Sequence, residues 1–110
     1  MEAIKNQIHE ILENEDVGIF SSKTQSIVEN TWERLGRFCY ENYKIEDLFH
    51  ISAPMLSDYL TTKYGSDLGA LYLKTECSRI LKLIKVFQTR GIDTQEYEAV
   101  IQKFKVQLQK

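Results

Sequence analysis

The sequence has few of the residues that interrupt secondary structure or link it covalently. Of its 110 residues one is proline, five are glycine and two are cysteine. Because proline breaks a helix interior, a single proline leaves room for long uninterrupted helices. Two cysteines, Cys39 and Cys77, are too few for a disulfide framework. We therefore expect both thiols to be buried and unreactive.

Long apolar runs and targeting patterns are also missing. No stretch approaches the ~18 apolar residues that a membrane-spanning helix requires. The first residues, Met1–Lys5, lack the basic and apolar regions of a signal peptide. The sequence therefore predicts a cytoplasmic protein with no membrane partner.

Motifs that carry catalytic or metal chemistry are absent as well. The chain has no GxxxxGKS/T or GxGxxG loop for phosphate and no HExxH or CxxC pattern for metal. His9 and His50 stand far apart, and carboxylate pairs such as Glu46 and Asp47 lie near expected helix starts, where they favour the helix dipole. We expect no catalytic residue, no cofactor and no metal site, so the chain is not an enzyme on its own.

What the sequence does contain is helical periodicity. Apolar residues are 43% and charged residues 27%, which is typical of a globular domain, and the length suits one domain over 1–110. Apolar spacing and turn residues predict helices at about 1–14, 22–43, 52–64, 67–90 and 93–110. The predicted fold is all-α, a small bundle of four to five helices. It divides into an N-terminal helix and linker (1–20), a central region (21–92) and a C-terminal helix (93–110).

Local signals set the expected helix ends. Residues 22–25 and 93–96 have the form of capping boxes, with Ser22 and Asp93 at the N-caps. Ser52 can cap the third helix ahead of Pro54, and Gly91 is expected to stop the fourth. Gly65 and Ser66 are expected to separate the third and fourth helices. The predicted core contains Val28, Trp32, Leu35, Leu60, Ile80, Ile84 and Phe87.

Gly36 lies inside the second predicted helix. Glycine there is unfavourable by roughly 1 kcal/mol relative to alanine. Close packing by a neighbouring element would explain it.

Charge is unevenly distributed along the chain. The total of 14 bases and 16 acids gives a net charge of −2, which argues on average against a nucleic-acid binder. Residues 66–90, however, carry five bases and two acids, whereas residues 1–22 carry one base and five acids. The positive charge is therefore concentrated in the centre of the chain.

On the second and fourth predicted helices, basic residues lie opposite the apolar face. They are Lys23, Arg34 and Arg37 on the second helix, and Lys74, Arg79, Lys82, Lys85 and Arg90 on the fourth. Beyond its first turn the fourth helix has one acid, Glu76. Charged residues opposite an apolar face are the ordinary solvated surface of a helix. The alternative interpretation is a DNA-binding face whose bases neutralise phosphates while Ser and Thr add hydrogen bonds.

Three segments resemble a known family. Residues 23–38 are similar to the opening of the N-terminal core-binding domain of tyrosine recombinases, the phage-integrase family. Residues 47–60 and 73–92 resemble later helices of the same SAM-like domain. The resemblance covers about residues 21–92.

This resemblance implies a function. In such domains a small helical bundle clamps double-stranded DNA together with a separate catalytic domain. The second and fourth helices face the major groove, and the first and last helices meet neighbouring recombinase subunits. The chain would then be the non-catalytic, DNA-binding half of a site-specific recombinase acting in DNA recombination and integration. It contains no His-x-x-Arg of the catalytic domain.

A different class of function remains open. The acidic N-terminal segment and the pI of about 5.7 also suit a small helical protein–protein interaction domain. In that case the amphipathic first or last helix would dock on a partner.

Overall fold

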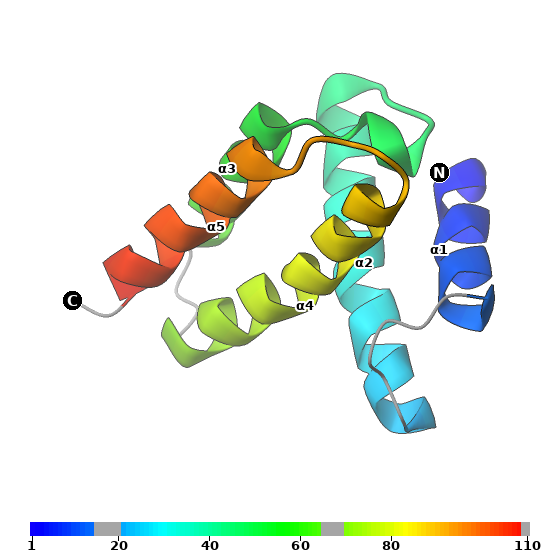
Figure 1. Ribbon diagram of the computed structural model, residues 1–110, viewed down its shortest axis with the longest axis horizontal. Helices are drawn as coiled ribbons and strands as arrows, with labels where there is room; N and C mark the ends of the chain where they lie inside the picture. The colour runs from blue at the N-terminus through cyan, green and yellow to red at the C-terminus, as the bar shows by residue number, and fades with distance from the viewer. Residues whose placement is uncertain (15–20, 65–69, 109–110) are drawn as a thin grey trace. The chain divides into compact units, whose positions relative to one another are not determined.

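The computed structural model describes residues 1–14, 21–64 and 70–108 (Figure 1). All regular secondary structure in these ranges is helical, which confirms the predicted all-α fold. The elements are α1 (Glu2–Asn14), α2 (Ser22–Tyr43), the 3-10 turn η1 (Leu48–His50), α3 (Ala53–Tyr64), α4 (Ala70–Thr89) and α5 (Gln95–Leu108). They fall into two compact units, Met1–Ile51 and Ser52–Lys110. None of the helices in the described ranges has the length and hydrophobicity needed to cross a bilayer.

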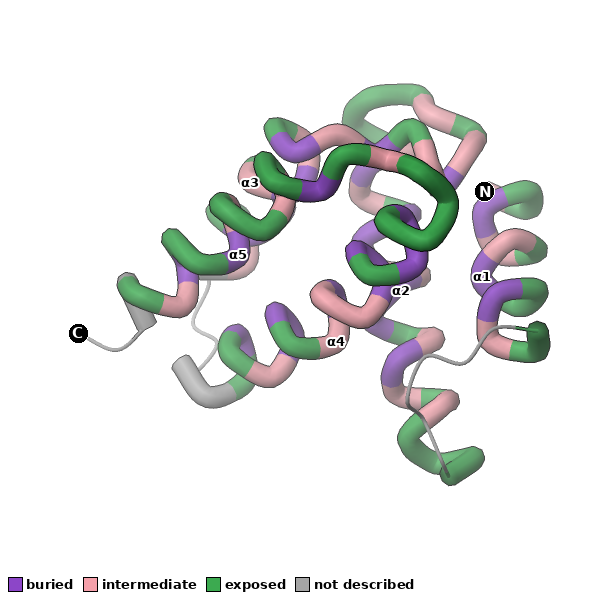
Figure 2. Tube along the Cα trace, viewed as in Figure 1, coloured by how far each residue is buried: buried purple, intermediate pink, exposed green. Residues whose placement is uncertain are grey.

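In the first unit, α1 packs against α2. Apolar spacing on the first helix predicts an inward stripe of Ile4, Ile8, Ile11 and Leu12. The first three are buried and Leu12 is half-buried, and Figure 2 shows the buried positions along α1. The two helices lie close together at Gly36, where an added Cβ would lie 2.7 Å from Cγ2 of Ile4. This contact explains a glycine inside a helix, as the sequence analysis expected.

The start of α2 differs by one residue from the prediction. The N-cap is Ser21 and not Ser22, because Ser21 is extended and its Oγ accepts a hydrogen bond from the Thr24 N–H at 3.1 Å. Ser22 is already helical. Two consecutive serines offer the same side-chain acceptor, so sequence alone does not distinguish between them.

Gln7 joins α1 to the segment that follows α2. Its Nε2 donates to Oδ1 of Asp47 at 2.9 Å, and its Oε1 accepts the Leu48 N–H at 2.7 Å. Oδ1 of Asp47 also accepts the Phe49 N–H at 2.9 Å, which caps η1. One amide side chain therefore fixes η1 against α1 across about forty residues of sequence.

In the second unit, the helix ends follow the predicted signals. Ser52 Oγ accepts the Met55 N–H at 3.4 Å at the start of α3. Gly91 ends α4 with φ of 84°, a conformation that side chains disfavour. Its N–H donates to Gln88 O at 3.0 Å, and the Ile92 N–H donates to Phe87 O at 3.1 Å. The Phe87 carbonyl also accepts the Arg90 N–H at 3.1 Å, and together these bonds satisfy carbonyls of the last turn of α4.

The helix α5 begins slightly later than expected. Asp93 Oδ1 accepts the N–H of Gln95, the first helical residue, at 3.1 Å. The carbonyl of the buried Thr94 accepts the Glu98 N–H at 2.9 Å. Asp93 therefore acts just outside the helix and not as its N-cap. Gly65 and Ser66 lie outside the described residues.

All seven residues of the predicted core are buried. In the first unit they are Val28, Trp32 and Leu35, and in the second Leu60, Ile80, Ile84 and Phe87. Phe87 meets Tyr97 edge-on with ring centroids 5.6 Å apart, which brings the end of α4 beside the start of α5. The burial of these residues follows from apolar spacing.

We expect Gly36→Ala to lower the free energy of unfolding, measured by urea denaturation. The added methyl meets Ile4, and overpacking costs about 1–3 kcal/mol, more than the roughly 1 kcal/mol that alanine gains in helix propensity. Ile4→Ala removes the opposing methyl, so in that background Gly36→Ala should be neutral or stabilising. The same loss in both backgrounds would contradict the contact.

We also expect the bonds around Asp47 to make stability depend on pH. The hydrogen bond from Gln7 lowers the pKa of the Asp47 carboxyl, against a smaller opposing effect of burial, and the Phe49 N–H and nearby His50 lower it further. The carboxylate therefore stabilises the fold above the unfolded-state pKa of ~3.9, and this stability is lost as pH falls through the lower folded-state pKa.

Urea denaturation between about pH 5 and pH 2 tests this contribution. The Asp47→Asn variant should lose less stability than the wild type as pH falls. Glu46→Gln removes the same charge one residue away, so it should keep the wild-type pH dependence. Parallel curves for wild type and Asp47→Asn would rule the contribution out.

Candidate nucleic-acid interface

The basic residues of α4 lie on its solvent side. Lys74 and Lys85 are exposed, as is Arg90 just after the helix. At 100° per residue the two lysines lie within about 20° of each other, separated by about 16 Å along the axis. Ser78 and Thr89 are exposed beside them. We call Lys74, Ser78, Lys85 and Thr89 the outer face of α4.

Arg79 and Lys82 project less than the sequence predicted. Both are half-buried. Val86, which lies between them around the helix axis, is only 4% exposed. The helical wheel had placed this side of α4 opposite the core, but neighbouring structure covers part of it. The open basic surface is therefore narrower than expected.

Glu76 is not on this surface. It is fully buried, and its Oε1 accepts a hydrogen bond from the Tyr59 hydroxyl of α3 at 2.8 Å. Glu76 is also the one acid in the sequence of α4. The charged side chains that α4 exposes, wholly or in part, within the described residues are consequently all basic.

The thiol of Cys77, next to Glu76, is buried, as expected. Burial raises the pKa of Cys77 to about 11, against the opposing positive charge of Lys105 and with a further increase from Glu76. Cys39 is buried too. At neutral pH the Cys77 thiol is therefore protonated and is a poor nucleophile.

On α2 the predicted basic residues share the surface with acids. Lys23 and Arg37 are exposed, whereas Arg34 is half-buried and its Nη2 donates to Thr31 Oγ1 at 3.2 Å. The same helix exposes Glu41. The basic residues of α2 and α4 also belong to different compact units. The structure therefore gives α4 alone a uniformly basic outer face.

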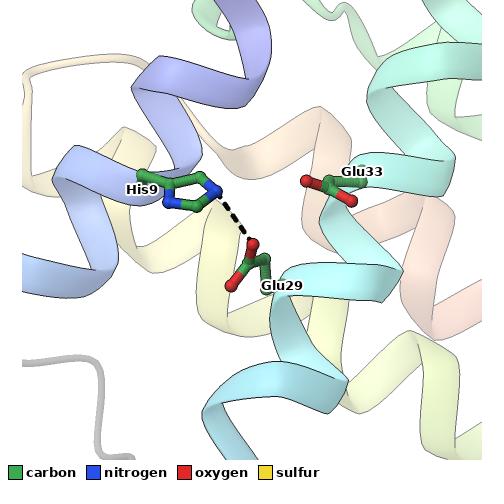
Figure 3. A group of neighbouring side chains, drawn as sticks. All are labelled: His9, Glu29 and Glu33. Atoms are coloured by element: carbon green, nitrogen blue, oxygen red, sulfur yellow. Dashed lines mark ion pairs between the residues drawn. The ribbon is translucent and has the colours of Figure 1, made fainter.

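Sequence reasoning missed one group of side chains. Facing helices bring together His9 of α1 with Glu29 and Glu33 of α2, and their ligand atoms all lie within 4.8 Å of one another (Figure 3). The i, i+4 spacing of the two glutamates was visible in the sequence. That His9 lies opposite them depends on how α1 packs on α2, so His9 had been taken as isolated.

The charge of the two units differs in sign. Residues 1–51 contain five bases and ten acids, and residues 52–110 contain nine bases and six acids. The first unit is therefore net −5 and the second net +3. The net charge of −2 for the whole chain is thus the sum of an acidic first unit and a basic second unit.

Comparisons with known protein families, with curated proteins and with solved structures found no match to this chain. The similarity to tyrosine recombinases therefore stays a prediction from sequence.

We expect Tyr59→Phe to destabilise the protein by about 1–3 kcal/mol, because it removes a hydrogen bond to a buried carboxylate. Thermal or urea unfolding measures this loss. Tyr72→Phe is the matched control, because Tyr72 lies on α4 and is 38% exposed. Its effect should stay within about ±0.5 kcal/mol. Equal effects of the two substitutions would contradict a stabilising role of the buried bond.

Proposed function

We propose that this chain binds double-stranded DNA through the outer face of α4. One observation carries the proposal: the only acid of α4 is buried, so the helix presents basic side chains to solvent. Lys74 and Lys85 would neutralise phosphates. The Ser78 and Thr89 hydroxyls donate to the Lys74 and Val86 carbonyls in the free chain, so they would have to turn outward to donate to a phosphate. Arg90 extends the basic surface beyond the helix end.

The size and charge of this face suit a phosphate backbone. One DNA strand carries a charge every ~3.4 Å along the axis, and the two lysines span about 16 Å. A helix with such a face fits a major groove about 12 Å wide. The net +3 of the second unit supports binding there, and the −5 of the first unit makes α2 the weaker contributor. Binding should therefore be modest and sensitive to salt.

The biological role that we propose is the non-catalytic, core-binding half of a site-specific tyrosine recombinase, acting in the cytoplasm. The similarity of residues 23–38, 47–60 and 73–92 to that family supports this role. In this role Lys23, Arg34, Arg37, Arg79 and Lys82 would contribute further phosphate contacts. The helices α1 and α5 would meet neighbouring subunits, and the catalytic step would belong to another domain.

One observation favours an alternative, a protein-interaction domain. Glu2, Glu10 and Glu13 are exposed on α1, while Lys5 is half-buried. This acidic surface would repel DNA and attract a basic protein partner. The same titration separates the two functions.

Fluorescence anisotropy with a labelled duplex of about 20 base pairs tests DNA binding. Titrations between about 50 and 200 mM salt should give a log K that falls with log salt by about 0.9 per phosphate neutralised. Lys74→Ala with Lys85→Ala should weaken binding similarly on every duplex and reduce this slope by roughly 2. Both lysines are exposed, so folding should hardly change.

The control is Lys103→Ala with Lys105→Ala on α5, which changes the net charge equally. This variant should bind nearly as tightly as the wild type and keep its slope. An equal loss of DNA affinity in the two variants would mean that the total charge of the chain, and not the outer face of α4, determines binding. Unchanged affinity of a folded α4 variant would refute the face and favour the protein-interaction domain.

A further inference from the structure

Three side chains that can bind a metal ion lie together on α1 and α2: His9, Glu29 and Glu33. Glu29 and Glu33 are one turn apart on α2, and His9 reaches them from α1 (Figure 3). His9 Nε2 lies 2.9 Å from Glu29 Oε1, and the third ligand atom lies within 4.8 Å of both. His9 is exposed and the two glutamates are half-buried.

These side chains are a donor set that transition metals prefer. Imidazole nitrogen and carboxylate oxygen both bind Zn²⁺, at about 2.0–2.2 Å. Mg²⁺ and Ca²⁺ instead favour all-oxygen sites. The imidazole therefore favours Zn²⁺ or a similar transition metal over the hard cations.

The ligands are already held near the required positions. In a tetrahedral zinc site neighbouring ligand atoms are about 3.3 Å apart, from the bond lengths of about 2.0–2.1 Å. The His9–Glu29 pair is at 2.9 Å, so it must open slightly, while the other ligand atoms, which lie within 4.8 Å, must close by at most about 1.5 Å. The His9 side chain is 56% exposed, which leaves it room to turn.

The helices α1 and α2, which carry the three side chains, are held together by contacts described above. Ile4 of α1 packs against Gly36 of α2, and Gln7 of α1 accepts a hydrogen bond from the Leu48 N–H of η1. A preformed arrangement reduces the ordering that binding must impose. Ligands on two helices would also make the metal a cross-link between α1 and α2.

We propose that His9, Glu29 and Glu33 bind one Zn²⁺ ion on the surface shared by α1 and α2, with the remaining coordination position taken by water. Zn²⁺ takes the place of the direct His9–Glu29 contact and binds the His9 imidazole in its neutral form, so a proton held by His9 would be released to solvent. Because Zn²⁺ binds the folded form, it should stabilise α1 on α2 and raise the unfolding temperature as its concentration increases.

The test uses the full chain freed of metal with a chelator, titrated with ZnCl₂ by calorimetry and by thermal unfolding. We expect one ion per chain and a rise in Tm, with no comparable response to MgCl₂. His9→Ala and Glu33→Gln should each weaken zinc binding by about 10-fold or more, as loss of groups in a metal site generally does. Circular dichroism confirms that each variant is folded.

The two variants and one control separate the metal site from the ion pair. The 2.9 Å contact of His9 is with Glu29, so Glu33→Gln leaves this contact in place and tests the third ligand. His50→Ala is the control, because His50 faces a single carboxylate, with Nε2 3.8 Å from Asp47 Oδ2. It should bind zinc as the wild type does.

Three results would overturn the proposal. The first is no zinc binding by the folded wild type at about 1 mM zinc, which would correspond to less than about 4 kcal/mol of binding free energy. The second is unchanged affinity in Glu33→Gln, which leaves only a surface ion pair. The third is an equal loss of affinity in His50→Ala, which would indicate unspecific binding to histidine.

Discussion

The close approach of α1 to α2 at Gly36 is the constraint on which the first unit depends. A side chain at this position would push Ile4 outward, because its Cβ would lie 2.7 Å from the Ile4 methyl. With no side chain, α1 lies close enough for Gln7 to reach Asp47 and the backbone of η1. The same approach brings His9 to Glu29. Packing, the connection to η1 and the candidate metal ligands therefore share one cause.

In the second unit the decisive feature is the burial of the acidic residue Glu76. Glu76 lies within a helix that carries four bases, yet it is buried and accepts the Tyr59 hydroxyl. Its burial costs solvation energy, which the hydrogen bond offsets in part. Its burial also removes the one acidic side chain of α4 from the surface of the helix. A helix of mixed charge in the sequence becomes a helix with a basic outer face in the structure.

The signals that sequence reasoning used well were local. Apolar spacing predicted the helices and all seven core residues, and Gly91 and Ser52 predicted helix ends, because each signal acts within a few residues. Contacts across long separations were not predictable, since a helical wheel shows a face without showing what covers it. Val86 and Glu76 are buried, although neither was predicted to belong to the core. His9 and Glu29 meet only because α1 packs on α2.

Net charge illustrates the same difference between composition and structure. At physiological salt, charges interact over about 8 Å, so a phosphate responds to the side chains near it and not to the sum over a chain. The −2 total combines a first unit of −5 with a second of +3. Acidic side chains are exposed on α1 and basic side chains on α4, so the surfaces of the two helices have opposite charge. A net charge of −2 for the whole chain is therefore no argument against DNA binding, because one compact unit holds nine of the 14 bases.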